Sequence, residues 1–261
     1  MTLEERSGTP AEDTSPFDDK SIRRLLVFCG HHRAGSTWLT HVLFAVADRY
    51  GLTYQKCEQK ELSPAADAFF QDHSLIDRAA LPPYRGAHLI RDPRDIVVSG
   101  YFYHLWTEEK WAHVSKQEFG GKSYLEYLNS LSKEEGLLVE MMRFANYDLR
   151  HMVAWDYQDP NFIEIRYENL IADEIGEFRR LFRHFGFSQV AIETSLRLAR
   201  VFSFERQAHR KIGQVQTGAH LRCGLTGQWR NVFGNRHRRL AKELLGTALI
   251  KLGYESSLDW T

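Results

Sequence analysis

A glycine loop between an apolar run and an amphipathic segment constrains this fold most. Leu25–Cys29 is wholly apolar, Gly30 and Gly35 bracket the loop, and Ser36 opens the segment that follows. Strand, glycine loop and helix in this order form the setting in which phosphate-binding loops occur. The chain is therefore expected to run from a buried strand directly into the first turn of a helix.

This loop differs from a nucleoside triphosphate site at one position. It has the spacing G-x-x-x-x-G-K-[ST], but Ser36 stands where the lysine belongs, and the loop's positive charge is Arg33. In ATP and GTP sites that lysine reaches the β- and γ-phosphates, and the next hydroxyl holds magnesium. Glycine torsions and the unpaired N–H groups of a helix start can still converge on one anion. The loop predicts a site for a phosphate-like dianion other than the triphosphate of ATP.

The composition excludes several classes of protein. The chain has 261 residues, 43% of them hydrophobic, and 34 basic residues balance 34 acidic ones. This length fits one large α/β domain. A formal net charge of zero gives no general attraction to nucleic acid or to an anionic membrane. We therefore expect a local anion site, and we expect neither a nucleic-acid partner nor a membrane partner.

Cysteine usage and the N-terminal segment predict the compartment. Cys29, Cys57 and Cys223 are widely spaced and odd in number, which fits a reducing compartment without disulfides or a cysteine zinc site. The first 20 residues are polar and acidic, without the apolar core of a signal peptide. No apolar run reaches membrane-spanning length. We expect a cytoplasmic protein that holds no metal.

Alternating strand and helix patterns predict the fold class. Strands are expected at 25–29, 87–90 and 162–167. Helices are expected over 36–50, 96–103, 174–185, 189–200 and 236–252, with 106–158 mostly helical. Because these strands alternate with helices, we expect an α/β fold with a central parallel β-sheet flanked by helices.

The domain boundaries follow from composition. Residues 1–20 are rich in Glu, Asp, Ser, Thr and Pro, so a disordered tail is expected there. Residues 21–261 are then a single domain, like the P-loop NTPases in its glycine loop after the first strand. Asp95 is the expected N-cap of the helix over 96–103. Residues 204–234 show few periodic signals and are expected to be a long functional loop.

A second segment with an anion signal follows a predicted strand. Arg91 begins where the strand over 87–90 ends. Ligands of open α/β sheets bind beyond the carboxyl ends of the strands, so Arg91 is expected at a binding site. Arg94 is instead expected to pair with Asp92 or Asp95.

A third signal lies in the predicted loop over 204–234. Arg222 is followed there by two glycines and by Trp229. A basic residue and two glycines without helical or strand periodicity suggest backbone that closes on a ligand, with a mobile surface loop as the alternative.

Five short segments, in order along the chain, match motifs of one enzyme family. They are 32–38 for P-K-S-G-T-T-W, Arg91 to Ser99 for R-x-x-x-D-x-x-x-S, 167–170 for Y-E-[DN]-L, 203–205 for Ser-Phe-Glu, and 222–231 for R-K-G-x-x-G-D-W-[KR]-N. Together they resemble the sulfotransferases that use 3′-phosphoadenosine 5′-phosphosulfate (PAPS). Each motif alone is modest, but five in order are specific.

The resemblance implies a role for each matched residue. Those implied to bind the 5′-phosphosulfate are Arg33, Ala34, Gly35, Ser36 and Thr37. Those implied near the 3′-phosphate are Arg91, Ser99, Arg222, Cys223 and Gly224. Those implied to pack near the adenine are Trp38, Tyr167 and Phe204. The implied catalytic residues are Arg33, a cation at the sulfuryl end, and His73, which stands where many members carry a histidine base.

The chain departs from the family pattern at several charged positions. Arg33 and Cys223 each replace a lysine, Gln71 replaces another, and Gln228 replaces an aspartate. The Cys223 replacement removes one positive charge near the implied 3′-phosphate site.

These observations predict a sulfotransferase that moves a sulfuryl group from PAPS, its cosubstrate, to a hydroxyl or amine of a small-molecule acceptor. Two alternatives stay open. One is an ATP-dependent small-molecule kinase, which a magnesium requirement would favour. The other is a PAPS-binding member without catalytic activity, which turnover of PAPS with any acceptor would exclude.

Overall fold

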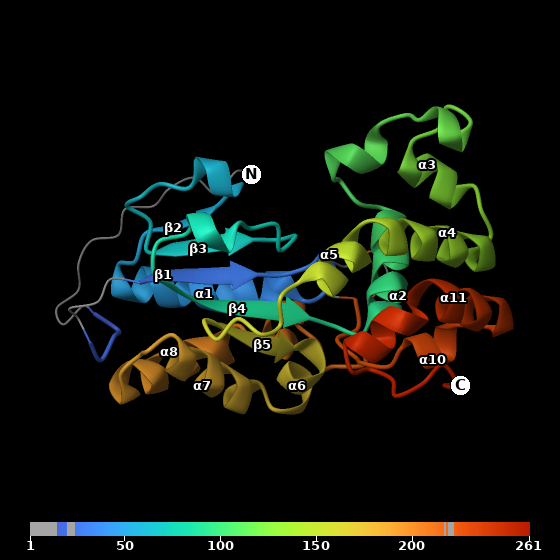
Figure 1. Ribbon diagram of the computed structural model, residues 1–261. Helices are drawn as coiled ribbons and strands as arrows, with labels where there is room; N and C mark the ends of the chain where they lie inside the picture. Colours follow the sequence, from blue (N-terminus) through green and yellow to red (C-terminus); the bar gives the residue numbers. More distant parts are fainter. Residues whose placement is uncertain (1–14, 20–23, 217, 219–221) are drawn as a thin grey trace. The chain divides into compact units, whose positions relative to one another are not determined.

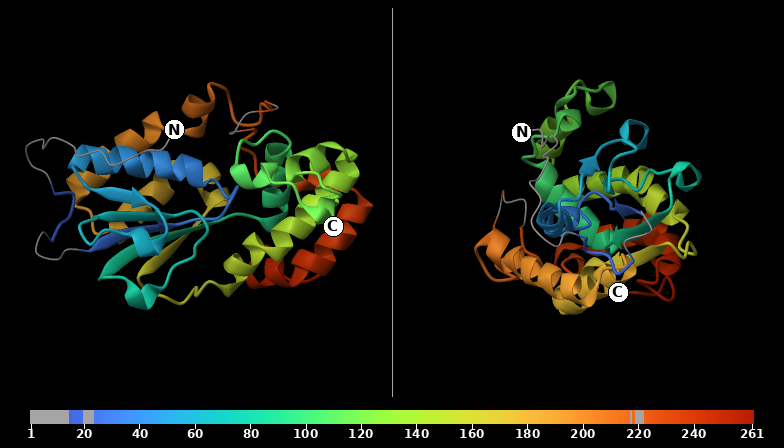
Figure 2. Two further views of the ribbon diagram at one scale, coloured as in Figure 1. Left: turned by 90° about the horizontal axis from the view of Figure 1, so that it is seen from above. Right: turned by 90° about the vertical axis from the view of Figure 1, so that its left-hand side faces the viewer.

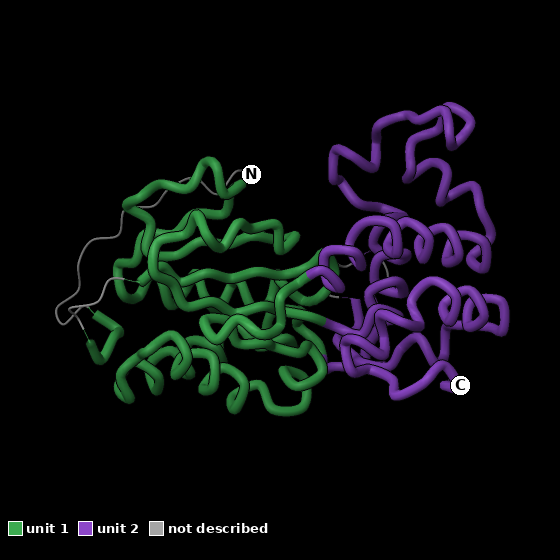
Figure 3. Tube along the Cα trace, in the orientation of Figure 1, with its two compact units in different colours: residues 1–90, 155–210 green, residues 91–154, 211–261 purple. Residues whose placement is uncertain are grey.

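The structure, a computed structural model, describes residues 15–19, 24–216, 218 and 222–261. The chain divides into two compact units (Figure 3). Unit 1 comprises residues 1–90 and 155–210, and unit 2 comprises residues 91–154 and 211–261. Most of the predicted tail over 1–20 lies outside the described residues, and the boundary of a domain over 21–261 stays a prediction.

A five-stranded parallel sheet forms the centre of unit 1 (Figure 1). Its strand order is β2-β3-β1-β4-β5, and every neighbouring pair is parallel. The strands are β1 (Leu25–Cys29), β2 (Tyr54–Lys56), β3 (Ala68–Gln71), β4 (Tyr84–Ile90) and β5 (Phe162–Arg166). The central position of β1 means that the glycine loop leaves the sheet between two strands.

The two faces of β1 pack against different layers, because successive side chains of a strand point to opposite sides. Leu25, Val27 and Cys29 belong to a buried cluster with Phe69 and Trp155. The alternate residues Leu26 and Phe28 face α1 (Ser36–Tyr50), whose Leu43 and Val46 line the same small apolar space. Figure 2 shows α1 running along one face of the sheet.

The remaining helices of unit 1 follow β5 in the chain. They are α6 (Tyr167–Ala172), α7 (Glu174–His184), α8 (Gln189–Val201) and α9 (Phe204–Ala208), and two short 3₁₀ turns cover Gln59–Glu61 and Arg78–Ala80. The α7 helix packs on α8, and α8 packs on α1. These contacts complete the helical layer beside the sheet.

Unit 2 is helical. Its helices are α2 (Pro93–His104), α3 (Tyr124–Asn129), α4 (Lys133–Asn146), α5 (Asp148–Ala154), α10 (Trp229–Val232) and α11 (Asn235–Lys251), with 3₁₀ turns at Lys110–His113 and Gln117–Phe119. The α2, α4 and α11 helices pack against one another. Leu137, Met141 and Phe144 on α4 are fully buried, as are Leu245 and Leu249 on α11.

The predicted fold class is confirmed: a parallel sheet is flanked by helices, and β1, α1, β5 and α7 lie close to their expected ranges. The expected cap is wrong. Asp92, not Asp95, is the N-cap of α2, since its carboxylate accepts the Arg94 N–H at 2.9 Å and Pro93 opens the helix. Proline suits the first helical position because it has no N–H to leave unpaired.

The segment over 204–234 is not a continuous loop, because α9 and α10 lie within it, and residues 217 and 219–221 are outside the described residues. The short strands β2 and β3 were not expected. Among the described residues, no helix is both long enough and apolar enough to cross a membrane.

Candidate active site

The glycine loop of unit 1 has the backbone of an anion-binding nest. The Ala34 N–H donates to the His31 carbonyl at 3.0 Å, which closes a turn directly after β1. Arg33 and Gly35 adopt left-handed torsions, with φ of 63° and 105°. Gly35 is the N-cap of α1 and brings no side chain to cap it. Concave backbone of this kind, at an uncapped helix start, directs N–H groups at an anion.

Gly35 is required on two counts. Its φ of 105° is unfavourable for any residue with a side chain. A Cβ atom there would also lie 2.6 Å from Cδ2 of Tyr167, the first residue of α6. The loop therefore packs against the Tyr167 ring through backbone alone.

The three residues implied near an adenine are buried in unit 1. Trp38 meets Tyr167 edge-on, with ring centroids 6.4 Å apart, and meets Phe178 in the same way. Phe204 is 3% exposed and opens α9. Trp38 and Tyr167 are thus in contact, whereas Phe204 lies on a separate element.

His73 lies in a turn that leaves the sheet beside the glycine loop. Cys29 at the end of β1 pairs with Gln71 at the end of β3, so the two following segments emerge at the same edge. The Gln71 side chain shapes this turn, because its Oε1 accepts the backbone N–H of His73 at 2.7 Å and of Leu75 at 3.2 Å. The side chain of His73 is half-buried.

In unit 2, the predicted site residues Arg91 and Arg222 are both basic. Arg91 is 5% exposed and donates to the Leu225 carbonyl at 3.2 Å. The guanidinium of Arg222 lies 4.3 Å from the ring centroid of Phe102 and also contacts Gln228. Burial, with a further contribution from the charge of Arg91, lowers the pKa of Arg222. A buried and a half-buried cation that influence each other favour a bound anion.

Asp95 on α2 binds the segment over 222–229, called here the Arg222 loop. Its carboxylate accepts the N–H of Gly227 at 2.6 Å and of Trp229 at 3.0 Å. It also lies 4.0 Å from the Arg91 guanidinium. Sequence reasoning missed this role because the bonded residues are more than 130 positions apart.

Arg94 is structural, as expected. It pairs with Asp92 at 2.8 Å and with Glu255 at 2.5 Å, and it stacks 3.9 Å from the Trp229 ring centroid. Of the other implied residues, Ser99 is half-buried on α2, Cys223 is 4% exposed, and Gly224 has a φ of 73°.

A buried polar cluster further along α2 was not predicted. His104 is fully buried, and its Nδ1 lies 2.8 Å from Oε2 of Glu140. Tyr124 donates its hydroxyl to the same carboxylate at 2.6 Å, and Arg143 donates at 2.9 Å. Burial opposes ionisation of Glu140, but Arg143 and His104 outweigh it and hold its pKa well below the usual value.

Comparison with known proteins decides the family. A sequence model described as the sulfotransferase domain matches residues 70–253. The chain belongs to the sulfotransferase family. It is therefore an enzyme of the class that transfers sulfuryl groups, although the family does not specify the acceptor. The matched range contains His73, Arg91 and Arg222 but begins after the glycine loop. A search of curated proteins found no match.

Solved structures resemble this sulfotransferase in fold. Mouse sulfotransferase SULT7A1 complexed with PAP is 16% identical with a TM-score of 0.60, covering 89% of this chain and 86% of that one. Retinol dehydratase in complex with androsterone and PAP is 17% identical with a TM-score of 0.55, covering 86% and 80%. Retinol dehydratase with retinol and PAP is 16% identical with a TM-score of 0.52, covering 86% and 81%. The sulfotransferase fold expected from the motifs is confirmed.

Proposed function

We propose that this sulfotransferase takes its sulfuryl group from PAPS and passes it to a hydroxyl or amine of a small-molecule acceptor. The observation that carries the proposal is the lysine-free anion nest of the glycine loop, with Arg33 as its cation. Two of the similar structures hold androsterone or retinol together with PAP, which supports both the donor and a small acceptor.

Each unit carries residues suited to one of the two anionic groups of PAPS. In unit 1, the 5′-phosphosulfate is assigned to Arg33, Ala34, Gly35, Ser36 and Thr37, and the adenine to Trp38, Tyr167 and Phe204. In unit 2, the 3′-phosphate is assigned to Arg91, Ser99, Arg222, Cys223 and Gly224. The mutual influence of Arg91 and Arg222 supports the second assignment, because an anion relieves the repulsion of like charges.

Catalysis then depends on positioned charge. PAPS, when bound, supplies a leaving group that is already a stable anion. The loop N–H groups, Ser36 and the Arg33 guanidinium stabilise negative charge as it develops on the transferred group. His73, at the same edge of the sheet as the loop, accepts the proton of the acceptor hydroxyl or amine.

The nucleotide preference tests this proposal. Calorimetry should show that adenosine 3′,5′-bisphosphate (PAP) binds more tightly than ATP, with or without magnesium, because the loop lacks the triphosphate lysine. Tighter ATP binding in magnesium would instead support a kinase. PAP binding without turnover of labelled PAPS, across a broad set of alcohols and amines, would support a non-catalytic member.

A cytoplasmic location is also part of the proposal. All three cysteines are free thiols, and Cys29 and Cys223 are buried. Free thiols are typical of a reducing compartment. Fractionation of the native host, followed by detection of the chain, would test this location.

A further inference from the structure

Two buried histidines meet behind the glycine loop of unit 1. His31 is the second residue of the loop, and His88 lies on the neighbouring strand β4; their exposed fractions are 0% and 1%. Their Nε2 atoms are 2.9 Å apart, which is a hydrogen-bond distance. Such a bond needs a hydrogen on one of these nitrogens and a bare lone pair on the other.

The surroundings keep the His88 ring neutral. Burial, with smaller contributions from His31 and Arg78, lowers the pKa of His88 well below its usual value. Nδ1 of His88 is buried and has no hydrogen-bond partner among the described residues. Nε2 is therefore the His88 nitrogen that bonds, and the tautomers of the two rings set which of them carries the shared hydrogen.

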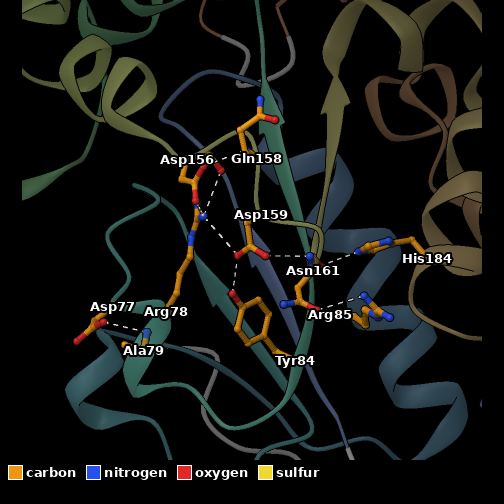
Figure 4. Close-up of polar contacts among 10 residues, drawn as sticks. All are labelled: Asp77, Arg78, Ala79, Tyr84, Arg85, Asp156, Gln158, Asp159, Asn161 and His184. Carbon is orange, nitrogen blue, oxygen red and sulfur yellow. Dashed lines mark hydrogen bonds and ion pairs between the residues drawn. The ribbon is translucent and has the colours of Figure 1, made fainter.

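His88 is itself held in a stack. Its ring lies parallel to that of Trp155, with centroids 4.0 Å apart and planes 14° apart. The Arg78 guanidinium lies 4.1 Å from the Trp155 ring centroid. Figure 4 shows that Arg78 is fixed in turn by Asp156 and Asp159. The His88 ring thus has a defined position before any ligand binds.

His31 belongs to the part of the loop that needs support. Its carbonyl closes the turn that contains Arg33, whose left-handed φ of 63° is unfavourable for a residue with a side chain. Such a conformation persists only where the surroundings impose it. Ser74 donates its hydroxyl to the Gly30 carbonyl at 2.9 Å and holds the preceding residue.

We propose that the hydrogen bond between His88 and His31 is a positioning contact that fixes the anion-binding loop in its ligand-ready conformation. His31 and His88 are positioning residues, not catalytic ones. The choice of PAP as the test ligand rests on the proposed function, whereas the proposed fixing of the loop does not. Two apolar side chains at positions 31 and 88 would fill the same space, but they could not hold the loop backbone at position 31 through a hydrogen bond.

Paired substitutions separate the hydrogen bond from the packing. His88→Phe keeps an aromatic ring on Trp155 and removes the hydrogen bond, whereas His88→Gln keeps an amide that can donate or accept at a similar reach and removes the ring. His184→Gln is the matched control: His184 is a half-buried histidine of unit 1 that bonds to the Asn161 carbonyl at 2.8 Å (Figure 4).

The readouts are hydrogen exchange of the loop amides in the ligand-free protein, and PAP affinity by calorimetry. In His88→Phe, exchange at the Ala34 amide should accelerate about tenfold, and PAP should bind about tenfold more weakly. His88→Gln should stay within about threefold of the unsubstituted protein on both measures. His184→Gln should change neither.

Several results would overturn the positioning role. Unchanged loop exchange in folded His88→Phe would do so, as would equal effects of His88→Phe and His88→Gln. If His88→Phe does not fold, ¹⁵N NMR of the unsubstituted protein decides, since absence of coupling between the two Nε2 nuclei would exclude the bond. Failure of the unsubstituted protein to bind PAP would refute the proposed function. Faster loop exchange in His88→Phe would still support the positioning role in that case.

Discussion

At the scale of single residues, buried charges in this chain have long-range partners that fix their roles. Arg91 and Arg94 are three positions apart, yet Arg94 is enclosed by Asp92, Glu255 and Trp229, whereas Arg91 contacts a carbonyl and lies 4.0 Å from Asp95. The sequence alone could separate them only partly, because Glu255 and Trp229 are distant along the chain. The structure gives Arg94 a structural role, and Arg91 stays the residue proposed for the 3′-phosphate.

Arg91→Ala should therefore weaken PAP binding at least tenfold, since a charged hydrogen bond contributes about 1.5–3 kcal/mol. Adenosine 5′-phosphosulfate lacks the 3′-phosphate, so its affinity should change much less. Calorimetry with both ligands measures the difference. Arg236→Ala, an exposed arginine of unit 2 paired with Glu134, is the control for loss of charge; equal weakening of both ligands would remove Arg91 from the 3′-phosphate site.

His73→Ala should lower kcat by roughly a hundredfold with little change in PAP affinity, because a general base acts in the transfer step and not in donor binding. His73→Asn should be almost as slow, since an amide cannot take up the proton. Steady-state kinetics with labelled PAPS measures this. Near-normal kcat in His73→Ala would assign the base elsewhere.

At the scale of elements, regular patterns were predictable and short or edge segments were not. The apolar run of β1 and the spacing of α1 gave their bounds directly, and Gly51 ends α1 in the left-handed conformation. By contrast, β2 has three residues at the edge of the sheet and β3 has four. Strands this short contain too few alternating apolar and polar residues to show a periodicity, so pairing with neighbouring strands determines where they form.

The candidate site follows the same division. Local sequence identified the glycine loop, because its residues are contiguous, and the loop and α1 lie as expected. It did not identify the His31–His88 contact or the bonds from Asp95 to the Arg222 loop, which join residues 57 and more than 130 positions apart. Such contacts depend on strand order and helix packing.

The two ends of α1 offer a matched pair of glycine substitutions. Gly35→Ala should abolish most PAP affinity, because its φ of 105° and the Tyr167 ring at 2.6 Å both oppose a methyl group. Gly51→Ala also strains a left-handed residue, with φ of 63°, but meets nothing within 4 Å. It should cost about 1 kcal/mol of stability and leave affinity unchanged. Calorimetry measures PAP affinity, and urea unfolding measures stability. Weak PAP binding by Gly51→Ala would show that loss of stability alone explains the weak PAP binding of Gly35→Ala.

Glu174, the first residue of α7, should make the stability of the folded chain depend on pH. Burial raises the pKa of Glu174 to about 7 from an ordinary value of 4.5, against the opposing charge of Arg200. Between these values the folded state binds more protons than the unfolded state, so stability should fall as pH rises from about 4.5 to 7. Glu174→Gln should flatten this decline in thermal unfolding. The exposed Glu243→Gln should retain the full decline, and an unchanged slope in Glu174→Gln would contradict the assignment.

At the scale of the whole molecule, ligand binding and unfolding are linked. A ligand that binds only the folded chain, at a hundred times its Kd, adds about 2.7 kcal/mol of stability, which for a chain of this size raises Tm by roughly 5–10 °C. PAP should produce this rise, and ATP at the same concentration should produce a much smaller one. Scanning fluorimetry measures both; an equal rise with ATP would contradict the nucleotide preference.

The chain crosses between its two units after Ile90, Ala154 and Arg210, so each unit is assembled from two separate stretches of sequence. Neither unit corresponds to one uninterrupted stretch of coding sequence. One crossover in the gene could therefore not exchange a whole unit, as it can where two domains follow one another and are joined by a linker. The helical unit and the sheet that carries the glycine loop are therefore inherited together.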